Sequence, residues 1–416
     1  MKNYIILICI SVILSSICSA QKSRVENWME DINFYHQTLE KNHIDLYHTI
    51  SKNKFNSEIL NIKEKLPKLN DFQVIVELMR LTHKVGGGKG DGHTSVPLWG
   101  MDLHKYPIKL FDFGNEIRVI EADNNHKYLI GKKIISIDGI PIDKVYSKVS
   151  ELTPFTENNQ SSMDRTCSYM MISEVLEALG IVKIKEKAKF TFIDDNGVEE
   201  MITMKSYSKV ELDSFEFETT QVSNTYFQRT KDSKIKDLWF TSLNNSKAVY
   251  IKFGEYPSEN EMNDFSESVY NFIEQNKSES LIIDLRNNYG GDFFIGQILA
   301  SWLNACDSII WKSNVYVLID RVTYSAAMVN ALQFKQLLNA KVIGEPTGAN
   351  PNGYQDLGQF KLPNSDLLIT YTKRLFRLQD LETKGLQPDI LIRPKWDNYK
   401  KGVDEVLYWV LNDIKN

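Results

Sequence analysis

The chain has 416 residues, enough for about two or three domains, and its 42% hydrophobic and 25% charged content is that of an ordinary globular protein. It carries 49 basic and 54 acidic residues, for a formal net charge of -5, without a strongly basic block. We therefore expect no nucleic-acid partner, because phosphate binding needs a concentrated positive surface.

Residues 1–20 have the pattern of a secretory signal peptide. Lys2 precedes the apolar run Tyr4–Ile17, and Cys18–Ala20 resembles a small-residue cleavage site. The alternative is a membrane anchor, but the run is short for a spanning helix. A lipid anchor is disfavoured because bulky Ile17 precedes the cysteine. We expect an exported protein, either periplasmic or secreted.

Removal of the signal peptide leaves Cys167 and Cys306. These two residues could pair in an exported protein, but they lie in very different segments. We therefore expect two buried thiols and no disulfide framework. No spacing of cysteines and histidines indicates zinc, so we expect no metal.

Residues 21–100 are predicted to form an N-terminal helical region. Asn70 or Asp71 can cap a helix over 72–84, and the region ends in a glycine-rich stretch before His93. Apolar residues recur at the three- and four-residue steps of amphipathic helices, at Val25, Trp28, Met29, Ile32 and Tyr35, and at Ile59, Ile62 and Leu66.

Residues 101–205 are predicted to be β-rich, with one helix around 172–179. Residues 206–246 are polar and weakly periodic, and we expect a connector there with a strand near 238–240. Short apolar runs beside turn signals lie at 117–120, 133–137 and 189–193.

Residues 247–416 show strand patterns that alternate with helical patterns. Such a series predicts an α/β fold with a largely parallel sheet covered by helices. Sites in these sheets form at the carboxyl ends of the strands. The expected strands are 248–253, 280–285, 315–319 and 341–343, and the expected helices are 259–275, 293–303 and 325–338.

Two of these strand ends carry the residues with the clearest chemistry. One strand breaks into a turn whose paired Gly290 and Gly291 could present bare backbone N–H groups. The next strand leads to Ser325 at the mouth of a helix, and a nucleophile beside N–H donors is what acyl transfer needs. The alternatives are that Ser325 only caps the helix and that the glycines only form a turn. Asp284 and Arg286 are expected to hold that turn.

His93 and Glu382 carry little signal when each is taken alone. A lone histidine is more often a surface or core group than a base, and Glu382 lies in a loop where a solvated carboxylate is expected. The glycines before His93 fit no phosphate or dinucleotide loop, since those follow a strand. They could instead let His93 reach another domain. No comparable context surrounds the other six histidines, His36, His43, His48, His83, His104 and His126.

Together these residues resemble the C-terminal-processing (tail-specific) serine peptidases, in the branch of the tricorn protease core. The segment Leu129–Gly139 is similar to the signature of PDZ peptide-binding modules. The resemblance to the peptidases covers roughly residues 245–395 and follows the ordered motifs Asp284–Gly291, Thr323–Ala327, Gly344–Gly348 and Gly385–Ile390, with Asp91–Thr94 upstream.

The resemblance implies a crotonase-like α/β core over 247–416, a β-rich and PDZ-like middle segment, and hydrolysis of peptide or protein substrates without a cofactor. The positions that match the family are Ser325 for the nucleophile, His93 for the general base, Glu382 for the acid that orients the relay, and Gly290 or Gly291 with the N–H of Ala326 for the oxyanion hole.

The chain departs from the family at two places. Members with a Ser–Lys dyad carry the lysine in the loop after the next strand. Here that loop is 347–353, and it contains no lysine. Lys335 and Lys341 look like solvated charges. Gly92 stands where the tricorn branch has a serine, and Thr94 could support the relay from the other side. We therefore favour a histidine as the base.

Two other classes of protein share the expected scaffold. One is a non-catalytic module that binds peptides or lipids, and the other is an acyl-CoA enzyme of crotonase type. Retention of the four site positions argues against the first, and the export signal argues against the second, because coenzyme A is a cytosolic cofactor. The sequence therefore favours an exported serine peptidase whose oligomeric state it leaves open.

Overall fold

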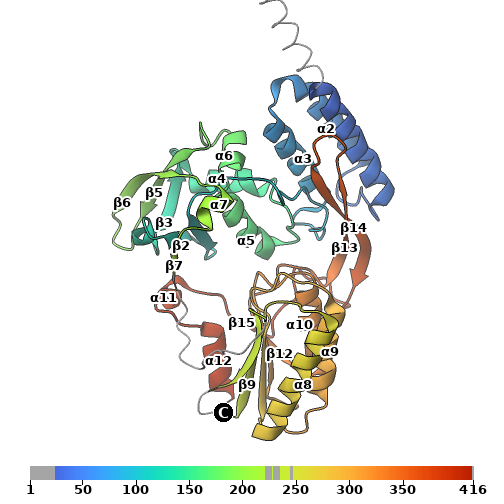
Figure 1. Ribbon diagram of the computed structural model, residues 1–416, viewed down its shortest axis with the longest axis vertical. Helices are drawn as coiled ribbons and strands as arrows, with labels where there is room; N and C mark the ends of the chain where they lie inside the picture. Colours follow the sequence, from blue (N-terminus) through green and yellow to red (C-terminus); the bar gives the residue numbers. More distant parts are fainter. Residues whose placement is uncertain (1–23, 221–226, 228–234, 244–246, 415–416) are drawn as a thin grey trace, which may run out of the picture.

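The computed structural model describes residues 24–220, 227, 235–243 and 247–414. The predicted signal peptide lies outside these residues. Within them, none of the helices combines the length and the apolar character needed to cross a lipid bilayer. In Figure 1 the N-terminal helices and a β-rich unit lie above a second unit that is built on a parallel sheet.

The N-terminal region is helical, as predicted. Residues 24–42 form a helix, followed by α2 (Lys52–Lys65), the 3-10 helix η1 (Leu66–Lys68) and α3 (Asp71–Gly86). Asn70 caps α3, because its side chain accepts from the N–H of Gln73 while the Gln73 side chain accepts from the N–H of Asn70. The apolar faces of these helices meet around buried Ile32, Phe55 and Leu78.

The β-rich unit contains a seven-stranded antiparallel sheet in the order β1-β2-β3-β5-β6, with β4 on β3 and β7 on β2. Part of the predicted connector, strand β7, therefore completes this sheet. The strands are β1 (Ile108–Asp112), β2 (Ile117–Asp123), β3 (Lys133–Ile137), β4 (Ile140–Pro141), β5 (Lys187–Ile193), β6 (Glu199–Lys205) and β7 (Phe217–Thr219). The helices are η2 (Lys127–Leu129), α4 (Ile142–Ser150), α5 (Asn159–Tyr169), α6 (Ser173–Ala178) and α7 (Lys209–Leu212).

The second unit contains a six-stranded sheet in the order β15-β12-β11-β10-β9-β8, which is parallel except for β8. The predicted parallel sheet is therefore confirmed. Its strands are β8 (Leu238–Ser242), β9 (Ala248–Phe253), β10 (Ser280–Asp284), β11 (Val315–Ile319), β12 (Lys341–Gly344) and β15 (Ile390–Leu391). Its helices are α8 (Glu259–Asn276), α9 (Phe293–Asn304), α10 (Ala326–Leu337), α11 (Trp396–Tyr399) and α12 (Glu405–Asp413).

Both faces of this parallel sheet are covered by helices. Leu281 and Ile283 of β10 point into the core beneath α8, α9 and α10. Ile282 points the other way, into a second core that includes Leu407 of α12. Every residue of β10 and β11 is buried, which explains why both strands are continuous apolar runs in the sequence.

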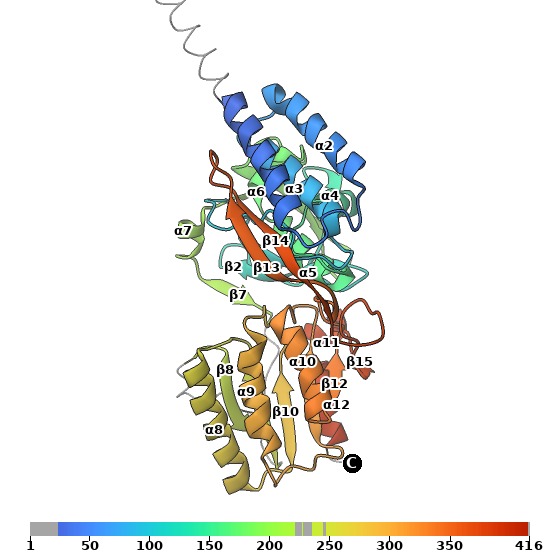
Figure 2. The same cartoon turned by 90° about the vertical axis from the view of Figure 1, so that its right-hand side faces the viewer.

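One hairpin leaves the second unit and packs on the N-terminal helices (Figure 2). It consists of β13 (Asn352–Lys361) and β14 (Leu368–Arg377). Ile369 of the hairpin is buried in the same core as the N-terminal helices, and the Phe360 ring contacts the Phe34 ring at 5.9 Å between centroids. The hairpin therefore connects the region of His93 to the unit of Ser325.

Cys167 and Cys306 are both free and buried. This confirms the prediction of two buried thiols.

Candidate active site

Ser325 lies at a strained corner between β11 and α10. Its φ of 47° and ψ of -121° fall outside the regions that a serine ordinarily adopts, and α10 begins at the next residue, Ala326. The Ser325 side chain does not cap the helix. This observation removes the helix-cap alternative and leaves a hydroxyl on a strained strand–helix turn, where strain is typical of functional sites.

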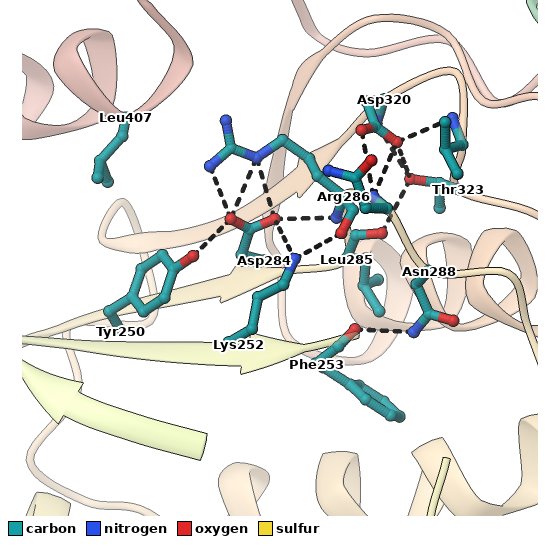
Figure 3. Close-up of polar contacts among 12 residues, drawn as sticks. Tyr250, Lys252, Phe253, Asp284, Leu285, Arg286, Asn288, Asp320, Thr323 and Leu407 are labelled. Atoms are coloured by element: carbon teal, nitrogen blue, oxygen red, sulfur yellow. Dashed lines mark hydrogen bonds and ion pairs between the residues drawn. The ribbon is translucent and has the colours of Figure 1, made fainter. Parts of the chain in front are cut away.

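The glycine turn after β10 is built on a network of charged side chains (Figure 3). The Arg286 guanidinium pairs with Asp284 at 2.6 Å and with Asp404, which caps α12, at 2.8 Å. Burial opposes the ionised form of Asp284, but Arg286 and Lys252 outweigh it and hold the pKa of this carboxyl well below its ordinary value. The predicted structural role of Asp284 and Arg286 is confirmed.

The turns after β10 and β11 are also joined to each other. The hydroxyl of Thr323 donates to the carbonyl of Leu285 at 3.0 Å and accepts from the N–H of Asp320. The Asp320 carboxylate accepts from the N–H of Asn287 at 3.1 Å (Figure 3). These bonds hold the serine turn and the glycine turn side by side.

Asn288 fixes the approach of the glycines to Ser325. Its amide donates to the carbonyl of Phe253 at 2.7 Å, its side-chain oxygen accepts from the N–H of Gly290 at 2.9 Å, and its carbonyl accepts from the N–H of Tyr324 at 2.9 Å. Asn288 lies inside the Asp284–Gly291 motif, but no sequence pattern marked its role. Because the N–H of Gly290 is engaged, Gly291 is the better candidate for an oxyanion donor.

Gly290 packs directly against the serine turn. A Cβ at this position would lie 2.9 Å from the Ser325 Cβ and 2.9 Å from the Tyr324 carbonyl oxygen, and the φ of Gly290 is +91°. Among the described residues, the N–H groups of Gly291 and Ala326 make no hydrogen bond. One free N–H therefore follows Ser325 directly, at Ala326, and another follows Gly290, which touches the serine turn.

His93 lies in the loop that follows α3. Its Nδ1 is buried without a hydrogen-bond partner among the described residues and lies 3.8 Å from Oε1 of Glu157. Burial lowers the pKa of His93, Asp91 raises it and Arg165 lowers it. No hydrogen bond joins His93 and Ser325 within the described residues, so the predicted nucleophile–base pair stays a prediction.

Glu157 is the acidic group that faces His93. Its Oε2 accepts from the N–H of Asn350 at 2.8 Å and from the amide of Gln355 at 3.1 Å. Burial raises the pKa of Glu157 to about 8. Glu157 was not predicted from the sequence. No local pattern marks it, because it lies 64 positions beyond His93, in the residue before the cap of α5.

Glu382 lies in an exposed loop and lines a cleft of about 570 Å³. Glu157, Tyr354 and Asn350 line the same cleft. The loop of Glu382 is attached to the rest of the site through Gly385, whose N–H donates to the Asn350 side chain at 2.7 Å. Glu382 and Glu157 are therefore two carboxylates of one cleft, and only Glu157 contacts the surroundings of His93 in this arrangement.

His43 and His48 hold the loop of His93 through Asp91. Their Nε2 atoms lie 2.9 Å and 3.3 Å from Oδ2 of Asp91. Burial opposes the ionised form of Asp91, but the hydrogen bonds from both histidines keep its pKa well below the ordinary value. Thr94, predicted as a support for the relay, contacts His43 at 2.8 Å instead.

The three side chains of His43, His48 and Asp91 are close enough to share a metal ion. The hydrogen-bond pattern does not fit this use. The N–H of Asp45 donates to Nδ1 of His43, so the ring proton is on Nε2, the atom that a metal would need. The cluster is therefore better described as a hydrogen-bonded support for the loop over 91–94.

Neither Lys335 nor Lys341 is placed to act as a base for Ser325. Lys335 pairs with Asp389 at 2.5 Å and Lys341 pairs with Asp413 at 2.6 Å. Both are partly exposed ion pairs and neither contacts Ser325, which agrees with the prediction that they are solvated charges. The loop after β12 contributes Asn350 in place of a lysine.

Comparisons with known proteins agree with this geometry. Residues 296–392 match the model of peptidase family S41. The crystal structure of mature CPAF is 10% identical in sequence and superimposes with a TM-score of 0.64, covering 94% of this chain and 97% of that chain. The structure of mature CPAF complexed with lactacystin is 11% identical with a TM-score of 0.62, covering 94% and 98%. No curated protein shows significant sequence similarity.

The structural similarity to CPAF shows that the mixed α/β fold extends over nearly the whole chain. The family match includes α10, β12 and the hairpin, with Ser325 inside it. It contains three of the motifs found in the sequence, Thr323–Ala327, Gly344–Gly348 and Gly385–Ile390, while Asp284–Gly291 and Asp91–Thr94 lie before it. Residues 296–392 are therefore similar to peptidase family S41, and the chain shares the fold of CPAF, in agreement with the serine peptidase resemblance of the motifs.

Proposed function

We propose that this peptidase is exported and cleaves peptide bonds through an acyl-enzyme on Ser325, with His93 as the general base. The observation that carries the proposal is the strained, uncapped Ser325 against the glycine turn, with unengaged N–H groups at Gly291 and Ala326 and a buried His93 whose Nδ1 lacks a hydrogen-bond partner among the described residues. The signal-peptide pattern over 1–20 supports export.

In this mechanism His93 removes the proton of the Ser325 hydroxyl as its oxygen attacks the substrate carbonyl. The N–H groups of Ala326 and of the glycine turn hold the negative charge of the tetrahedral intermediate. His93 then protonates the leaving amine, and a water molecule attacks the acyl-enzyme with the same base. Catalytic hydrogen bonds are often longer without substrate, so peptide binding is expected to draw His93 and Ser325 together.

We also propose the domain division that the motifs imply. It places the helical region at 21–100, a PDZ-like segment at 101–205, a connector at 206–246 and a crotonase-like core at 247–416. The six-stranded, mainly parallel sheet with helices on both faces supports the last assignment.

Labelling with a fluorophosphonate probe tests the nucleophile. Wild-type protein should label and Ser325→Ala should not, while Ser301→Ala, which changes an exposed serine on α9, should label like the wild type. Equal labelling of wild type and Ser325→Ala would refute the assignment.

The pH dependence of acylation tests the base. Because burial lowers the pKa of His93 below 6.5, the ring stays neutral and able to accept a proton at pH 6.5. The rate should therefore fall only as the pH drops further, and His93→Ala should lose the acid limb together with about 100-fold or more in rate. A His93→Ala enzyme with the wild-type pH profile would remove His93 from the mechanism.

The acidic partner of His93 is a choice between Glu382 and Glu157. The family resemblance favours Glu382, and the 3.8 Å separation from His93 favours Glu157. Comparing kcat for Glu382→Gln and Glu157→Gln decides between them, because the variant that removes the true partner loses more activity while the other keeps most of it.

A further inference from the structure

Arg165 of α5 lies against the segment that carries the nucleophile. Its guanidinium stacks over the ring of Tyr324, 4.4 Å from the centroid, and over the ring of Phe155 at 5.3 Å. The Tyr324 hydroxyl donates to Asp164 at 2.9 Å. These contacts place the cation against Tyr324, the residue that immediately precedes the candidate nucleophile Ser325.

Arg165 is a cation without a counter-ion. Its Nε is buried without a hydrogen-bond partner, and the side chain makes no ion pair with any residue that the structure describes. Every other arginine that is buried or half-buried in the described part of the chain pairs with a carboxylate, namely Arg24, Arg80, Arg118, Arg286 and Arg321. A partly desolvated guanidinium is costly to leave unpaired, so a partner from outside the chain is expected.

The charges around Arg165 do not supply that partner. Glu157, which lines the cleft, interacts electrostatically with Arg165. Burial nevertheless raises the pKa of Glu157 to about 8, so that this carboxyl is uncharged at neutral pH. Asp164 is occupied by Tyr324. The cleft that Glu157 lines carries three exposed cations that form no ion pair among the described residues, Lys89, Arg377 and Lys384.

We propose that Arg165 binds a carboxylate of the substrate next to the bond that is cleaved, and that this peptidase therefore prefers peptides with an anionic group there. This inference rests on the proposed function of Ser325 and names the substrate class of the same site. The carboxylate is either an acidic side chain or a free chain end. Arginine suits both, because its planar guanidinium binds a carboxylate through two parallel hydrogen bonds.

The experiment compares matched peptides in a cleavage assay. Each parent peptide found in a mixed library is made in four forms: acidic, with Glu replaced by Gln, with a free carboxyl end, and with an amidated end. Wild type, Arg165→Gln, Arg165→Lys and the control Arg80→Gln, which changes an ion-paired arginine of α3, are assayed on each. Binding of the same peptides is measured by fluorescence anisotropy on the Ser325→Ala background.

We expect wild type and Arg80→Gln to prefer one carboxylate form by about 10-fold or more in kcat/KM, Arg165→Gln to lose that preference, and Arg165→Lys to recover part of it. A preference for the acidic form over the Gln form identifies the carboxylate as a side chain. A preference for the free over the amidated end identifies it as the chain end. Equal cleavage of all forms by wild type, or an equal loss by Arg165→Gln on charged and neutral peptides, would overturn the inference and leave the peptidase function intact. Preferential binding without any cleavage would support Arg165 and refute the Ser325 mechanism.

Discussion

At the scale of single residues, the site depends on backbone conformations that only particular side chains permit. Ser325 has a positive φ although it is not a glycine, and Gly290 has a positive φ while it touches the serine turn. The strained serine and the glycine lie against each other, and Asn288 holds them there through both turns. Strain of this kind persists only when surrounding contacts over-determine it.

Gly290→Ala tests the requirement for a bare backbone. Both the φ of +91° and the 2.9 Å approach to Ser325 oppose a side chain, so we expect a loss of about 100-fold in kcat/KM. Gly114→Ala is the matched control, because Gly114 has a φ of +95° with nothing within 4 Å of its added Cβ. Gly114→Ala should lose about 1 kcal/mol in urea unfolding through its φ alone, and Gly290→Ala should lose more because its Cβ also clashes; only Gly290→Ala should lose activity. Full activity of Gly290→Ala would contradict this account.

The raised pKa of Glu157 predicts how the free energy of unfolding changes with pH. The folded state keeps the proton of Glu157 up to about pH 8, while the unfolded chain releases it near the ordinary value of 4.5. Between these values the native state binds more protons, so this group lowers the free energy of unfolding as pH rises, by about 1.4 kcal/mol per unit at most.

Glu157→Gln removes that contribution. The variant should therefore gain stability relative to the wild type between pH 5 and pH 9, as measured by urea unfolding across that range. Parallel stability profiles of the two proteins would show that Glu157 is not buried in this way.

At the scale of elements, the hairpin β13–β14 is shared between two units. It continues the chain of the parallel-sheet unit, yet its buried side chains belong to the core of the N-terminal helices. Tyr354 of β13 stacks on His48 with ring centroids 4.0 Å apart, and its N–H donates to the carbonyl of Gly90. The hairpin thus carries part of the wall around His93.

Asp31 tests how firmly the hairpin is attached. The buried carboxylate accepts from the N–H of Asn364 at 2.8 Å and from the N–H of Ser365 at 2.9 Å, at the hairpin tip. Asp31→Ala leaves both donors unpaired and should lower the free energy of unfolding by about 2–3 kcal/mol. Asp366→Asn, which removes the exposed ion-pair partner of Lys361 at the same tip and keeps a side chain that tolerates the φ of 57°, should cost under about 1 kcal/mol. Similar losses for both would contradict a buried anchoring role for Asp31.

At the scale of the whole molecule, the C-terminal segment ties the β-rich unit to the parallel sheet. Strand β15 and helix α12 belong to the sheet, whereas α11 between them packs on the β-rich unit (Figure 1). The Arg118 guanidinium lies 4.7 Å from the centroid of the Trp396 ring, and Tyr399 stacks on Phe111 at 5.9 Å.

Trp396→Ala should weaken the contact between α11 and the β-rich unit. We expect calorimetric unfolding to separate into two transitions, because the β-rich unit and the parallel sheet keep their own cores when the contact is lost. Tyr408→Ala on α12, which changes a 53% exposed side chain of the same segment, should unfold like the wild type. A single unchanged transition for Trp396→Ala would show that other contacts couple the units.

Patterns of neighbouring residues predicted the strands and helices whose formation depends mainly on their own sequence. Strand β11 follows the expected 315–319 residue by residue, α9 and α10 begin within one residue of expectation, and Asn70 caps α3 as proposed. The hairpin and α12 were missed, because their burial depends on which surface they meet and not on their own periodicity. The membership of β7 in the first sheet was missed for the same reason.

The sequence by itself determined the alternation of strands and helices, the place of Ser325 after a buried strand, and the absence of a lysine in the following loop. Each of these features depends on residues that are neighbours in the chain. The tertiary structure alone decided that Glu157 faces His93, that His43 and His48 share Asp91, and that Arg165 lies unpaired over Tyr324. Such contacts join segments between 43 and 160 residues apart, as His48–Asp91 and Tyr324–Asp164 show. They form only when the chain folds, and no periodic pattern of neighbouring residues encodes them.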